Sequence, residues 1–330
     1  MKRRLYLKLS NRCNANCSYC FQGENHKGAI TNEEVVGRTI RRLINSYQEV
    51  FLFGGEPFLD VNVNSIKAIL ELSEKNNIYA FTNGYFGDAS RALLLNNSNA
   101  FRSIIISIDG PRDVHNSRRP IRGMDGYGRI IENIHFLVSA SIACHVQINI
   151  DTDNICQVDE TVDLINEEFH GQVPITLNRV LHSSKTISMK VFLEMLGKYK
   201  SETGKKNVFV NSNALINLEC HKNNKMGEKC RCHISDTIIL DFETHEITCC
   251  PENTRSKIGL WNKNYALINP VRRIKISNKP QRRIIKCIGC QWAYYCEYGC
   301  SFEDIPENCK SIAEENYSIA NIILEGKNEV

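Results

Sequence analysis

Cys13, Cys17 and Cys20 lie within one run, Cys-Asn-Ala-Asn-Cys-Ser-Tyr-Cys, directly after a short alternating apolar segment. Three thiolates with this spacing can bind three irons of a [4Fe–4S] cube, whereas clusters that only carry electrons usually have four cysteine ligands. The fourth iron is then left without a protein ligand, and an open iron is where a small molecule binds. A zinc loop is the alternative interpretation, but zinc loops usually repeat C-x2-C pairs.

Short polar or glycine-containing runs close three further apolar segments. They comprise Gly54, Gly55, Glu56 and Pro57 after the second segment, Thr82 and Asn83 after the third, and Ser107 and Asp109 after the fourth. Because glycine has no Cβ, a ligand can approach its backbone closely. The carboxylate of Glu56 can accept hydrogen bonds from an ammonium group. The glycines and Glu56 are therefore candidate ligand contacts.

Short apolar runs alternate with stretches of helical period between residues 5 and 196. The sequence predicts strands at Tyr6–Leu9, Val50–Phe53, Ile78–Thr82, Ile104–Ile108, His145–Ile150 and Ile175–Arg179. It predicts helices at Glu33–Ile44, Ser65–Glu74, Ala89–Leu95, Tyr127–Ser139, Val158–Glu168 and Ser188–Tyr199. Thr31 followed by Glu34 predicts a capping box at the start of the first helix.

Six strand–helix repeats indicate an α/β fold in which helices cover the outside of a parallel sheet. In TIM-like barrels the chemistry gathers at the C-terminal ends of the strands. The cysteine run directly follows the first predicted strand, so such a fold would place it at that end.

The composition is that of an ordinary soluble globular protein, with 42% hydrophobic and 24% charged residues among 330. Fifteen cysteines, however, indicate either disulfides in an oxidising compartment or metal ligation in a reducing one. The first residues contain no apolar stretch of signal-peptide length, and no apolar run of membrane-spanning length occurs. We therefore expect a cytoplasmic protein that uses its cysteines as metal ligands and does not contact a membrane.

The net charge of +4 is too small to indicate a nucleic-acid partner by itself. A local excess of lysine and arginine lies between residues 272 and 286. We interpret this excess as a solvated face or linker, and a patch for an acidic peptide segment is the alternative.

A largely polar stretch, Ser201–Lys229, predicts a junction between two domains, residues 1–205 and 206–330. Residues 220–309 hold ten cysteines and few helix signals. A hairpin-like pattern covers Thr237–Leu240 and Glu246–Thr248, and a last amphipathic helix is predicted at Ser311–Leu324. The second domain is therefore expected to be small and rich in cysteine.

The cysteine triad, the aromatic residue before its last cysteine and the downstream Gly-Gly-Glu-Pro run resemble the signature of the radical S-adenosylmethionine (SAM) superfamily. The resemblance implies a partial TIM-like (β/α)6 barrel, a [4Fe–4S] cluster on the three cysteines and SAM at the open iron. The residues that it places around SAM are Tyr19, Gly54, Gly55, Glu56, Pro57, Thr82, Asn83, Ser107, Asp109 and Arg118.

Within that set, the resemblance implies that the Gly-Gly-Glu-Pro run holds the amino group of SAM. Ser107 and Arg118 are candidates for its carboxylate, and a structural role is the alternative for Asp109, His115 and Arg118. In this superfamily an electron cleaves SAM, and the resulting 5′-deoxyadenosyl radical takes a hydrogen atom from the substrate. The protein orients the cofactors and excludes water.

A second group of cysteines resembles the C-terminal signature of the SPASM family, named for the maturation of subtilosin, pyrroloquinoline quinone, anaerobic sulfatase and mycofactocin. It reads Cys287-x2-Cys290-x5-Cys296-x3-Cys300, then Cys309, with an upstream arm from Cys232 to Cys250. The glycine usual in that arm is replaced by Thr244 or His245, so either Cys249 or Cys250 is the ligand. We favour Cys250, because Ile247 then falls on the usual apolar position.

The resemblance implies two auxiliary [4Fe–4S] clusters, and therefore three clusters in the chain. One would take Cys230, Cys232, Cys250 and Cys300, and the other Cys287, Cys290, Cys296 and Cys309. Cys220 could replace Cys230. A zinc-stapled domain is the alternative, since Cys-Ile-Gly-Cys is also a zinc knuckle.

The SPASM resemblance implies a peptide maturase, an oxidoreductase that abstracts a hydrogen from a ribosomally made peptide and cross-links or otherwise oxidises a side chain. An anaerobic sulfatase maturase, which forms formylglycine on a protein, is an alternative, but Pro251 follows Cys250 where those enzymes carry an aspartate base. The radical cyclase of molybdenum cofactor synthesis is excluded by the C-terminal Lys-Asn-Glu-Val and the cysteine number. An electron-transfer or zinc-scaffold protein is the alternative from another class, and it has no use for an open iron.

The implied partners are a precursor peptide and an external electron donor of flavodoxin or ferredoxin type. Many such maturases carry an N-terminal leader-binding domain, whereas the first predicted strand of this chain begins at about residue 5. We therefore expect leader recognition by a separate protein, by the basic 272–286 segment or by the barrel rim.

Overall fold

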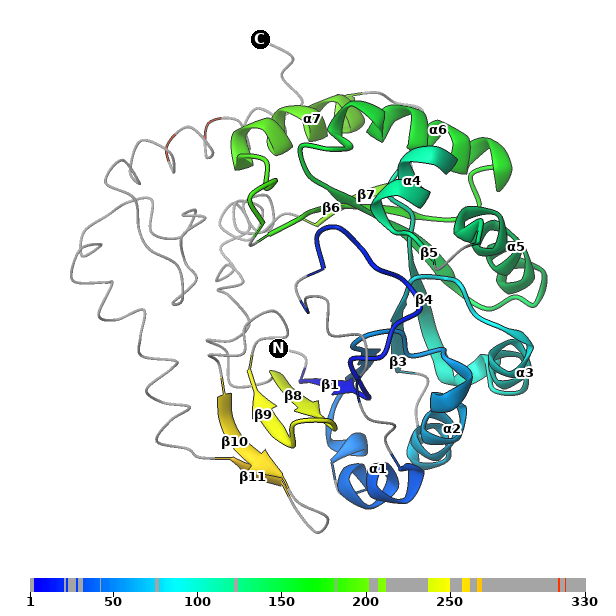
Figure 1. Ribbon diagram of the computed structural model, residues 1–330, viewed down its shortest axis with the longest axis vertical. Helices are drawn as coiled ribbons and strands as arrows, with labels where there is room; N and C mark the ends of the chain where they lie inside the picture. The colour runs from blue at the N-terminus through cyan, green and yellow to red at the C-terminus, as the bar shows by residue number, and fades with distance from the viewer. Residues whose placement is uncertain are drawn as a thin grey trace.

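The computed structural model describes residues 3–20, 22, 28, 32–41, 43–74, 77–121, 124–181, 183–201, 207–211, 237–249, 257–261, 266–268, 314 and 318. Their strands form one curved sheet, and helices cover its outer side (Figure 1). None of the helices in this part of the chain has the length and apolar character needed to cross a membrane.

The sheet has a parallel part and an antiparallel extension. The parallel strands are β1 (Arg4–Lys8), β2 (Glu49–Phe53), β3 (Ile78–Thr82), β4 (Phe101–Ser107), β5 (Cys144–Ile150), β6 (Ile175–Arg179), β7 (Val208–Asn211) and β8 (Thr237–Asp241). Strands β1 to β7 follow one another in space, whereas β8 pairs with the other side of β1. Strands β9 (Glu246–Thr248), β10 (Lys257–Trp261) and β11 (Ala266–Ile268) continue from β8 in antiparallel order.

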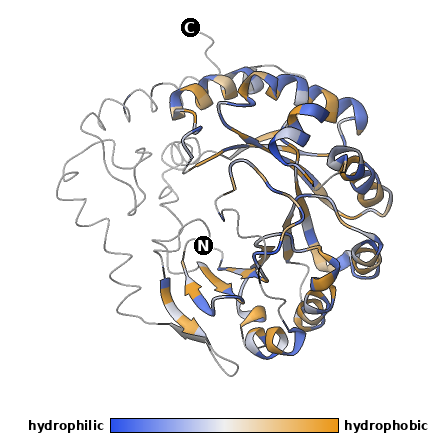
Figure 2. Ribbon diagram, in the orientation of Figure 1, coloured by the Kyte–Doolittle hydropathy of each residue, from blue (hydrophilic) through white to orange (hydrophobic). Residues whose placement is uncertain are grey.

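Seven α-helices and four 3-10 turns connect the described strands. The helices are α1 (Glu33–Ile40), α2 (Val63–Leu72), α3 (Asp88–Asn96), α4 (Arg112–Arg118), α5 (Gly126–Ser139), α6 (Val158–Glu168) and α7 (Met189–Ser201). The 3-10 turns are η1 (Ile44–Ser46), η2 (Asp60–Asn62), η3 (Ser98–Ala100) and η4 (Ile155–Gln157). Figure 2 shows apolar colour along the strands and both apolar and hydrophilic residues on the helices.

Alternation along the strands divides the apolar side chains between two cores. In β1, Leu5 and Leu7 belong to the large buried cluster that also contains helix residues such as Val36 and Ile40. Successive side chains of a strand point to opposite faces of the sheet, so Tyr6 lies on the inner face. There it belongs to a separate cluster with Phe51, Phe53 and Ile239, against which Tyr79 and Phe81 pack.

Stacked aromatic rings hold the inner cluster together. The ring centroids of Tyr6 and Phe51 lie 4.5 Å apart, and those of Phe51 and Tyr79 lie 4.8 Å apart. Such pairs contribute about 0.5–1.5 kcal/mol beyond the area they bury. Because Ile239 comes from β8, this core joins the sequence-distant strand to β1, β2 and β3.

All six strands and all six helices predicted between residues 5 and 196 are present, with shifted ends for most. The capping-box prediction is wrong, since Asn32 caps α1 and its side chain accepts from the backbone N–H groups of Glu34 and Val35. The first helix also ends at Ile40 rather than Ile44, and η1 follows it. Helix α4 was not predicted, because its seven residues are mostly polar and carry no apolar period.

The hairpin predicted after residue 236 is confirmed as β8 paired with β9. Its place in the fold was not predicted, because β8 joins the parallel sheet beside β1, and β7 extends the sheet at its other edge. The division at residue 205 stays a prediction. The helix at Ser311–Leu324 and the basic segment 272–286 lie outside the described residues, except for positions 314 and 318. Of the junction predicted at Ser201–Lys229, the structure describes residues 201 and 207–211, and β7 lies there.

Candidate functional site

The cysteine loop, which we define as residues 10–20, follows the C-terminal end of β1. Cys13, Cys17 and Cys20 on it are half-buried free thiols. The turn after β2 holds its first part, because the N–H of Gly55 donates to the Ser10 carbonyl at 2.9 Å and that of Glu56 donates to the Arg12 carbonyl at 2.7 Å. The loop is thereby fixed against the end of β2.

The segment after α4 holds the second part of the cysteine loop. The N–H of Asn16 donates to the Pro120 carbonyl at 3.0 Å, and that of Ser18 donates to the Arg118 carbonyl at 2.9 Å. Ala15 and Ile121 form an antiparallel bridge beside them. We call residues 118–121 the clamp segment, because their backbone pairs with the loop that carries the cysteines.

Gly54 and Gly55 allow a close approach of the chain's own backbone. A Cβ on Gly55 would lie 1.9 Å from the Arg12 carbonyl oxygen, and a Cβ on Gly54 would lie 2.7 Å from that of Ser10. Gly54 also has a φ of +127°, a conformation that favours glycine. Both glycines therefore admit the backbone of the cysteine loop, and their contact with a ligand stays a prediction.

Glu56 joins the ends of β2 and β3. One carboxylate oxygen accepts from the N–H of Phe58 at 2.9 Å and from the hydroxyl of Thr82 at 2.7 Å. The other accepts from the N–H of Asn83 at 2.7 Å. Burial raises the pKa of Glu56 to about 7, against the opposing effect of these hydrogen bonds. Glu56 thus acts as a buried connection, and its contact with SAM stays a prediction.

Asn83 links the end of β3 to the first cysteine. Its amide nitrogen donates to Asn14 Oδ1 at 2.6 Å and lies within hydrogen-bond range of Cys13 Sγ, at 3.8 Å. The N–H of Ala15 also donates to Cys13 Sγ, at 3.4 Å. Thiolates are better acceptors than thiols, so both donors suit a sulfur that carries negative charge.

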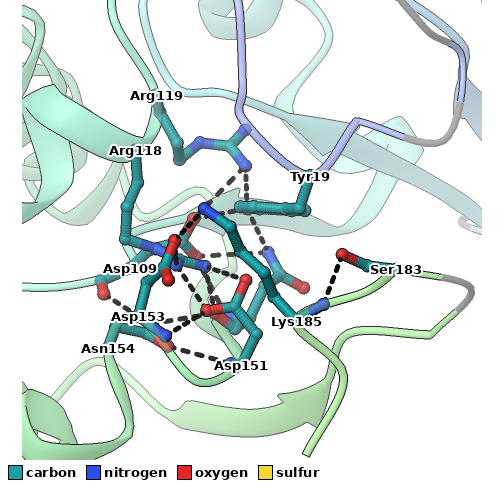
Figure 3. Close-up of polar contacts among 10 residues, drawn as sticks. Tyr19, Asp109, Arg118, Arg119, Asp151, Asp153, Asn154, Ser183 and Lys185 are labelled. Carbon is teal, nitrogen blue, oxygen red and sulfur yellow. Dashed lines mark hydrogen bonds and ion pairs between the residues drawn. The ribbon is translucent and has the colours of Figure 1, made fainter.

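Tyr19 sits at the centre of a buried polar cluster (Figure 3). Its hydroxyl donates to Asp109 Oδ2 and accepts a hydrogen bond from Arg119. Asn149 at the end of β5 donates to the same hydroxyl at 3.2 Å, and its N–H donates to Asp109 Oδ1 at 3.0 Å. Side chains from the cysteine loop, the clamp segment and the ends of β4 and β5 therefore meet at one point.

Arg118 forms a second ion pair beside this cluster. Its terminal nitrogens contact Asp151 at 2.6 and 3.1 Å, and both side chains are almost fully buried, with exposures of 4% and 0%. Asp153 lies 3.7 Å from Arg118 and also pairs with Lys185 (Figure 3). The guanidinium of Arg118 is therefore already neutralised within the chain, and its role towards the SAM carboxylate stays a prediction.

The two remaining candidates, Ser107 on β4 and His115 on α4, differ in their surroundings. Ser107 is half-buried as the last residue of β4. His115 is fully buried, and its Nδ1 accepts from the N–H of Asp109 at 3.2 Å. Burial lowers the pKa of His115 to about 4, so the ring is neutral at pH 7. The alternative of a structural role is thereby supported for His115.

Burial also controls the thiols of the cysteine loop. It raises the pKa of Cys13 to about 12 and raises that of Cys17, while the nearby positive charge of Arg119 opposes the rise at both. Without a metal these thiols are protonated at neutral pH, and cluster binding must release their protons. The donor set nevertheless fits a cluster, since three thiols share one loop and donors already point at Cys13 Sγ.

The inner face beside β5 and β6 carries amide side chains. Gln147 and Asn178 both donate to the Asn149 side-chain oxygen, at 2.9 and 3.0 Å. Both are half-buried, as are Tyr79 and Phe81 on the inner face of β3. Neutral amides and aromatic rings therefore line the inner surface below the cysteine loop.

Sequence reasoning missed three residues that the structure brings to the site. Arg119 and Asn149 both contact Tyr19, and Glu243 after β8 accepts from the N–H of Asn11 at 2.9 Å. Asn149 was detectable in principle, because the alternation of β5 places it on the inner face near the strand end. Arg119 and Glu243 carry no local signal, since they lie 100 and 232 residues from their partners.

The second group of cysteines lies outside the described residues. It comprises Cys230, Cys232, Cys250, Cys287, Cys290, Cys296, Cys300 and Cys309. Cys249, the alternative to Cys250, is described and buried next to β9. Among the residues that the structure covers, no three His, Cys, Asp or Glu side chains converge on a single metal ion. In a cube each thiolate binds a different iron.

One protein family matches the part of the chain that contains β2 to β5 and the side chains at their ends. The family described as the radical SAM superfamily covers residues 7–165. Residues 7–165 form a radical SAM domain. All three cysteines of the loop and the residues that contact Tyr19 lie within it.

One curated relative matches about half of the chain in sequence. The uncharacterized protein MJ0907 of Methanocaldococcus jannaschii is 27% identical over 169 residues, and the match covers 48% of this chain and 57% of that protein. The chain thus matches little more than half of the relative's length.

Solved structures resemble the chain over most of its length. Native anSMEcpe with bound AdoMet and Cp18Cys peptide has a TM-score of 0.71 at 18% identity and covers 98% of this chain and 99% of its own. Streptococcus suis SuiB bound to precursor peptide SuiA has a TM-score of 0.68 at 15% identity and covers 91% of this chain and 72% of its own. At these identities the likeness shows the fold, an α/β radical SAM fold with a mostly parallel sheet.

Proposed function

We propose that the chain is a radical SAM oxidoreductase that modifies a ribosomally made peptide. The observation that carries the proposal is the cysteine loop at the C-terminal edge of the parallel sheet, where Cys13, Cys17 and Cys20 lie beside the buried Tyr19–Asp109–Arg119 cluster. In barrels of parallel strands this edge is where active sites form.

Cys13, Cys17 and Cys20 would hold the cluster, and the ends of β2 to β4 would hold SAM. When bound, the two supply a 5′-deoxyadenosyl radical that removes a hydrogen atom from the substrate. The chain's own part is positional, because the clamp segment and the Gly54–Gly55 turn fix the cysteine loop. Tyr19 is held from three sides by Asp109, Arg119 and Asn149 and cannot turn freely.

The inner face of the sheet supports a peptide substrate. Gln147 and Asn178 offer neutral amides, and Tyr79 and Phe81 offer aromatic faces. Amides match the donors and acceptors of an extended peptide backbone. The solved anSMEcpe and SuiB structures contain a Cp18Cys peptide and the precursor peptide SuiA, respectively, which supports the same substrate class. A cross-link or other side-chain oxidation, the two auxiliary clusters, and a flavodoxin- or ferredoxin-type donor belong to this proposal.

The first test is anaerobic reconstitution of the full chain with iron and sulfide, followed by a SAM cleavage assay under dithionite. We expect about twelve irons per chain and production of 5′-deoxyadenosine. About four irons with cleavage would retain the radical chemistry and remove the auxiliary clusters. Zinc without cleavage would overturn the proposal.

Two variants test whether SAM cleavage depends on the cysteine loop. Replacement of Cys13, Cys17 and Cys20 together by alanine is expected to abolish cleavage and to remove about four irons. Cys156→Ala serves as the control, because Cys156 is an exposed thiol in η4 and not part of the cysteine loop. Full activity of the triple variant would show that the cysteine loop is not the site.

The peptide is tested by co-expression with a short reading frame adjacent to the gene. A cross-link removes two hydrogen atoms, so mass spectrometry should show that loss only when the active chain is present. Cleavage of SAM without any change in the peptide would retain the radical chemistry and overturn that peptide as the substrate.

A further inference from the structure

Arg119 places a buried positive charge next to the cysteine loop. Its side chain is 10% exposed, and one terminal nitrogen donates to the Tyr19 hydroxyl. The flanking carbonyls of Arg118 and Pro120 accept from Ser18 and Asn16 of the cysteine loop. The backbone on both sides of Arg119 is therefore bonded to the loop, and the residue cannot move away from it independently.

The charge of Arg119 is only partly balanced within the described residues. The nearest carboxylate oxygen, Asp109 Oδ2, lies 3.6 Å from it and also accepts from Tyr19. The other oxygen of Asp109 accepts from Asn149. The Nε of Arg119, like that of Arg118, is buried and has no hydrogen-bond partner in this part of the chain.

Arg118 provides the contrast within the same dipeptide. Two of its nitrogens contact both oxygens of the fully buried Asp151, and Asp153 lies 3.7 Å away. The positive charge of a guanidinium that is paired in this way has little electrostatic effect on other groups. The two neighbouring guanidinium groups therefore differ. The charge of Arg118 is neutralised by Asp151, whereas the charge of Arg119 is only partly balanced by Asp109 and acts on the cysteine loop.

We propose that the guanidinium of Arg119 is a fixed cation that raises the reduction potential of the cluster held by Cys13, Cys17 and Cys20. The inference rests on the proposed function, because it requires that cluster. Reduction adds one electron from the reductant, here dithionite, and neither makes nor breaks a bond. A cation close to the sulfurs stabilises the more negative, reduced form in a site of low dielectric constant.

The guanidinium of Arg119 lies against the cysteine loop, because it donates to the hydroxyl of Tyr19. Tyr19 stands between Cys17 and Cys20 in that loop. The charge of an arginine does not titrate in a protein, so its effect persists at every working pH.

The test is a redox titration followed by electron paramagnetic resonance, on the full reconstituted chain without SAM. The signal of this cluster is isolated by subtracting the spectrum of the triple cysteine-to-alanine variant. Arg119→Met should lower the reduced-to-oxidised ratio at a fixed potential at least tenfold, which is about 59 mV for a one-electron couple. Arg119→Lys retains the charge and should stay close to the unaltered chain.

Arg112→Met is the matched control. Arg112 lies on α4, seven residues before Arg119, but its side chain is 54% exposed and pairs with Asp125. Solvent and salt screen exposed charges, so its loss should leave the potential unchanged. Equal shifts in Arg119→Met and Arg119→Lys, or no shift in either, would overturn the inference.

If Arg119→Met takes up no iron, the reduction potential of Asp109→Asn tests the inference instead. This change removes the carboxylate charge that faces Arg119 and keeps the size of the side chain, so the potential should rise. An unchanged or lower potential would contradict the inference. If the unaltered chain binds no cluster on the three cysteines, the proposed function itself is overturned. The iron content of the unaltered chain is measured first, so this outcome is distinguished from a failure of the inference.

Discussion

At the level of single residues, the site is held by buried polar groups that satisfy one another across the ends of the strands. Glu56 accepts three hydrogen bonds, and Tyr19 joins Asp109, Arg119 and Asn149. Loss of one partner leaves the others buried without compensation, which costs more than the hydrogen bond itself contributes. Single substitutions here should therefore have large effects.

Glu56 should make stability depend on pH. Its folded pKa of about 7 exceeds the ordinary 4.5, so the folded chain keeps a proton that the unfolded chain loses between these values. The unfolding free energy should therefore fall as pH rises from about 4.5 to 7, by at most about 1.4 kcal/mol per unit. We expect this slope to be absent in Glu56→Gln, measured by anaerobic urea unfolding between pH 5 and 8.

Glu34→Gln is the control for that experiment, because Glu34 is exposed and pairs only with the exposed Arg38 among the described residues. It should keep the slope of the unaltered chain. Glu56→Gln should also lose about 1–3 kcal/mol, since its amide N–H faces backbone donors. An identical slope in all three proteins would contradict the raised pKa of Glu56.

Arg118→Met should destabilise the fold strongly. The change leaves Asp151, which is fully buried, without its guanidinium partner. Breaking a buried ion pair typically costs about 3–5 kcal/mol, and adding Asp151→Leu should restore part of it. Lys185→Met removes an exposed partner of Asp153 and should cost less than about 1 kcal/mol. Equal losses in the two single variants, measured by urea unfolding, would refute this account.

At the level of elements, the cysteine loop owes its shape to two neighbours that are not adjacent in sequence. The turn after β2 contacts its first half, and the clamp segment after α4 contacts its second half. The backbone hydrogen bonds at both contacts use no side chain of the loop. The shape of the loop should therefore be sensitive to backbone spacing at these two points.

Gly55→Ala should displace the cysteine loop, because the new Cβ would lie 1.9 Å from the Arg12 carbonyl oxygen. We expect fewer irons per chain after reconstitution and a lower melting temperature. Gly37→Ala makes the same chemical change inside α1, where the nearest atom is 4.0 Å away. It should raise stability by about 0.5–1 kcal/mol and leave iron uptake unchanged. Full iron uptake by Gly55→Ala would argue against the role of this turn.

At the level of the whole molecule, β8 completes the sheet beside β1 from more than 200 residues away in the sequence. Lys8 and Asp241 pair at 2.9 Å across these strands, and Ile239 fills the inner aromatic cluster. Glu243 after β8 then holds Asn11 at the start of the cysteine loop. The loop therefore depends on residues that lie beyond the predicted division at residue 205.

Ile239→Asp should destabilise the entire sheet by more than about 3 kcal/mol, because it buries a charge among aromatic rings without a partner. Leu260→Asp is the control, since Leu260 on β10 is 50% exposed; it should cost less than about 1 kcal/mol. Circular dichroism during urea unfolding should show a single transition in both. A separate early transition in Ile239→Asp that leaves β1 to β7 folded would show that residues before 205 form an independent unit.

Local patterns predicted much of this architecture. Period-two alternation fixes which segments become strands, and helical period fixes α1 to α3 and α5 to α7, because both depend on neighbours a few residues apart. Helix α4 and the N-cap at Asn32 were missed, since short polar stretches carry weak periodicity and several residues near a helix start can cap it. The pairing of β8 with β1 had no local signal.

The amino-acid sequence alone determined the three-cysteine loop, its position after a strand and the runs that close the next three strands, because these are local matters of residue type and spacing. Tertiary structure alone decided that Gly55 faces the cysteine loop, that Arg118 pairs closely with Asp151 while Arg119 is only partly balanced by Asp109, and that Glu243 reaches Asn11. These contacts join residues that only the parallel order of the strands brings together, and no pattern within a short stretch of chain encodes that order.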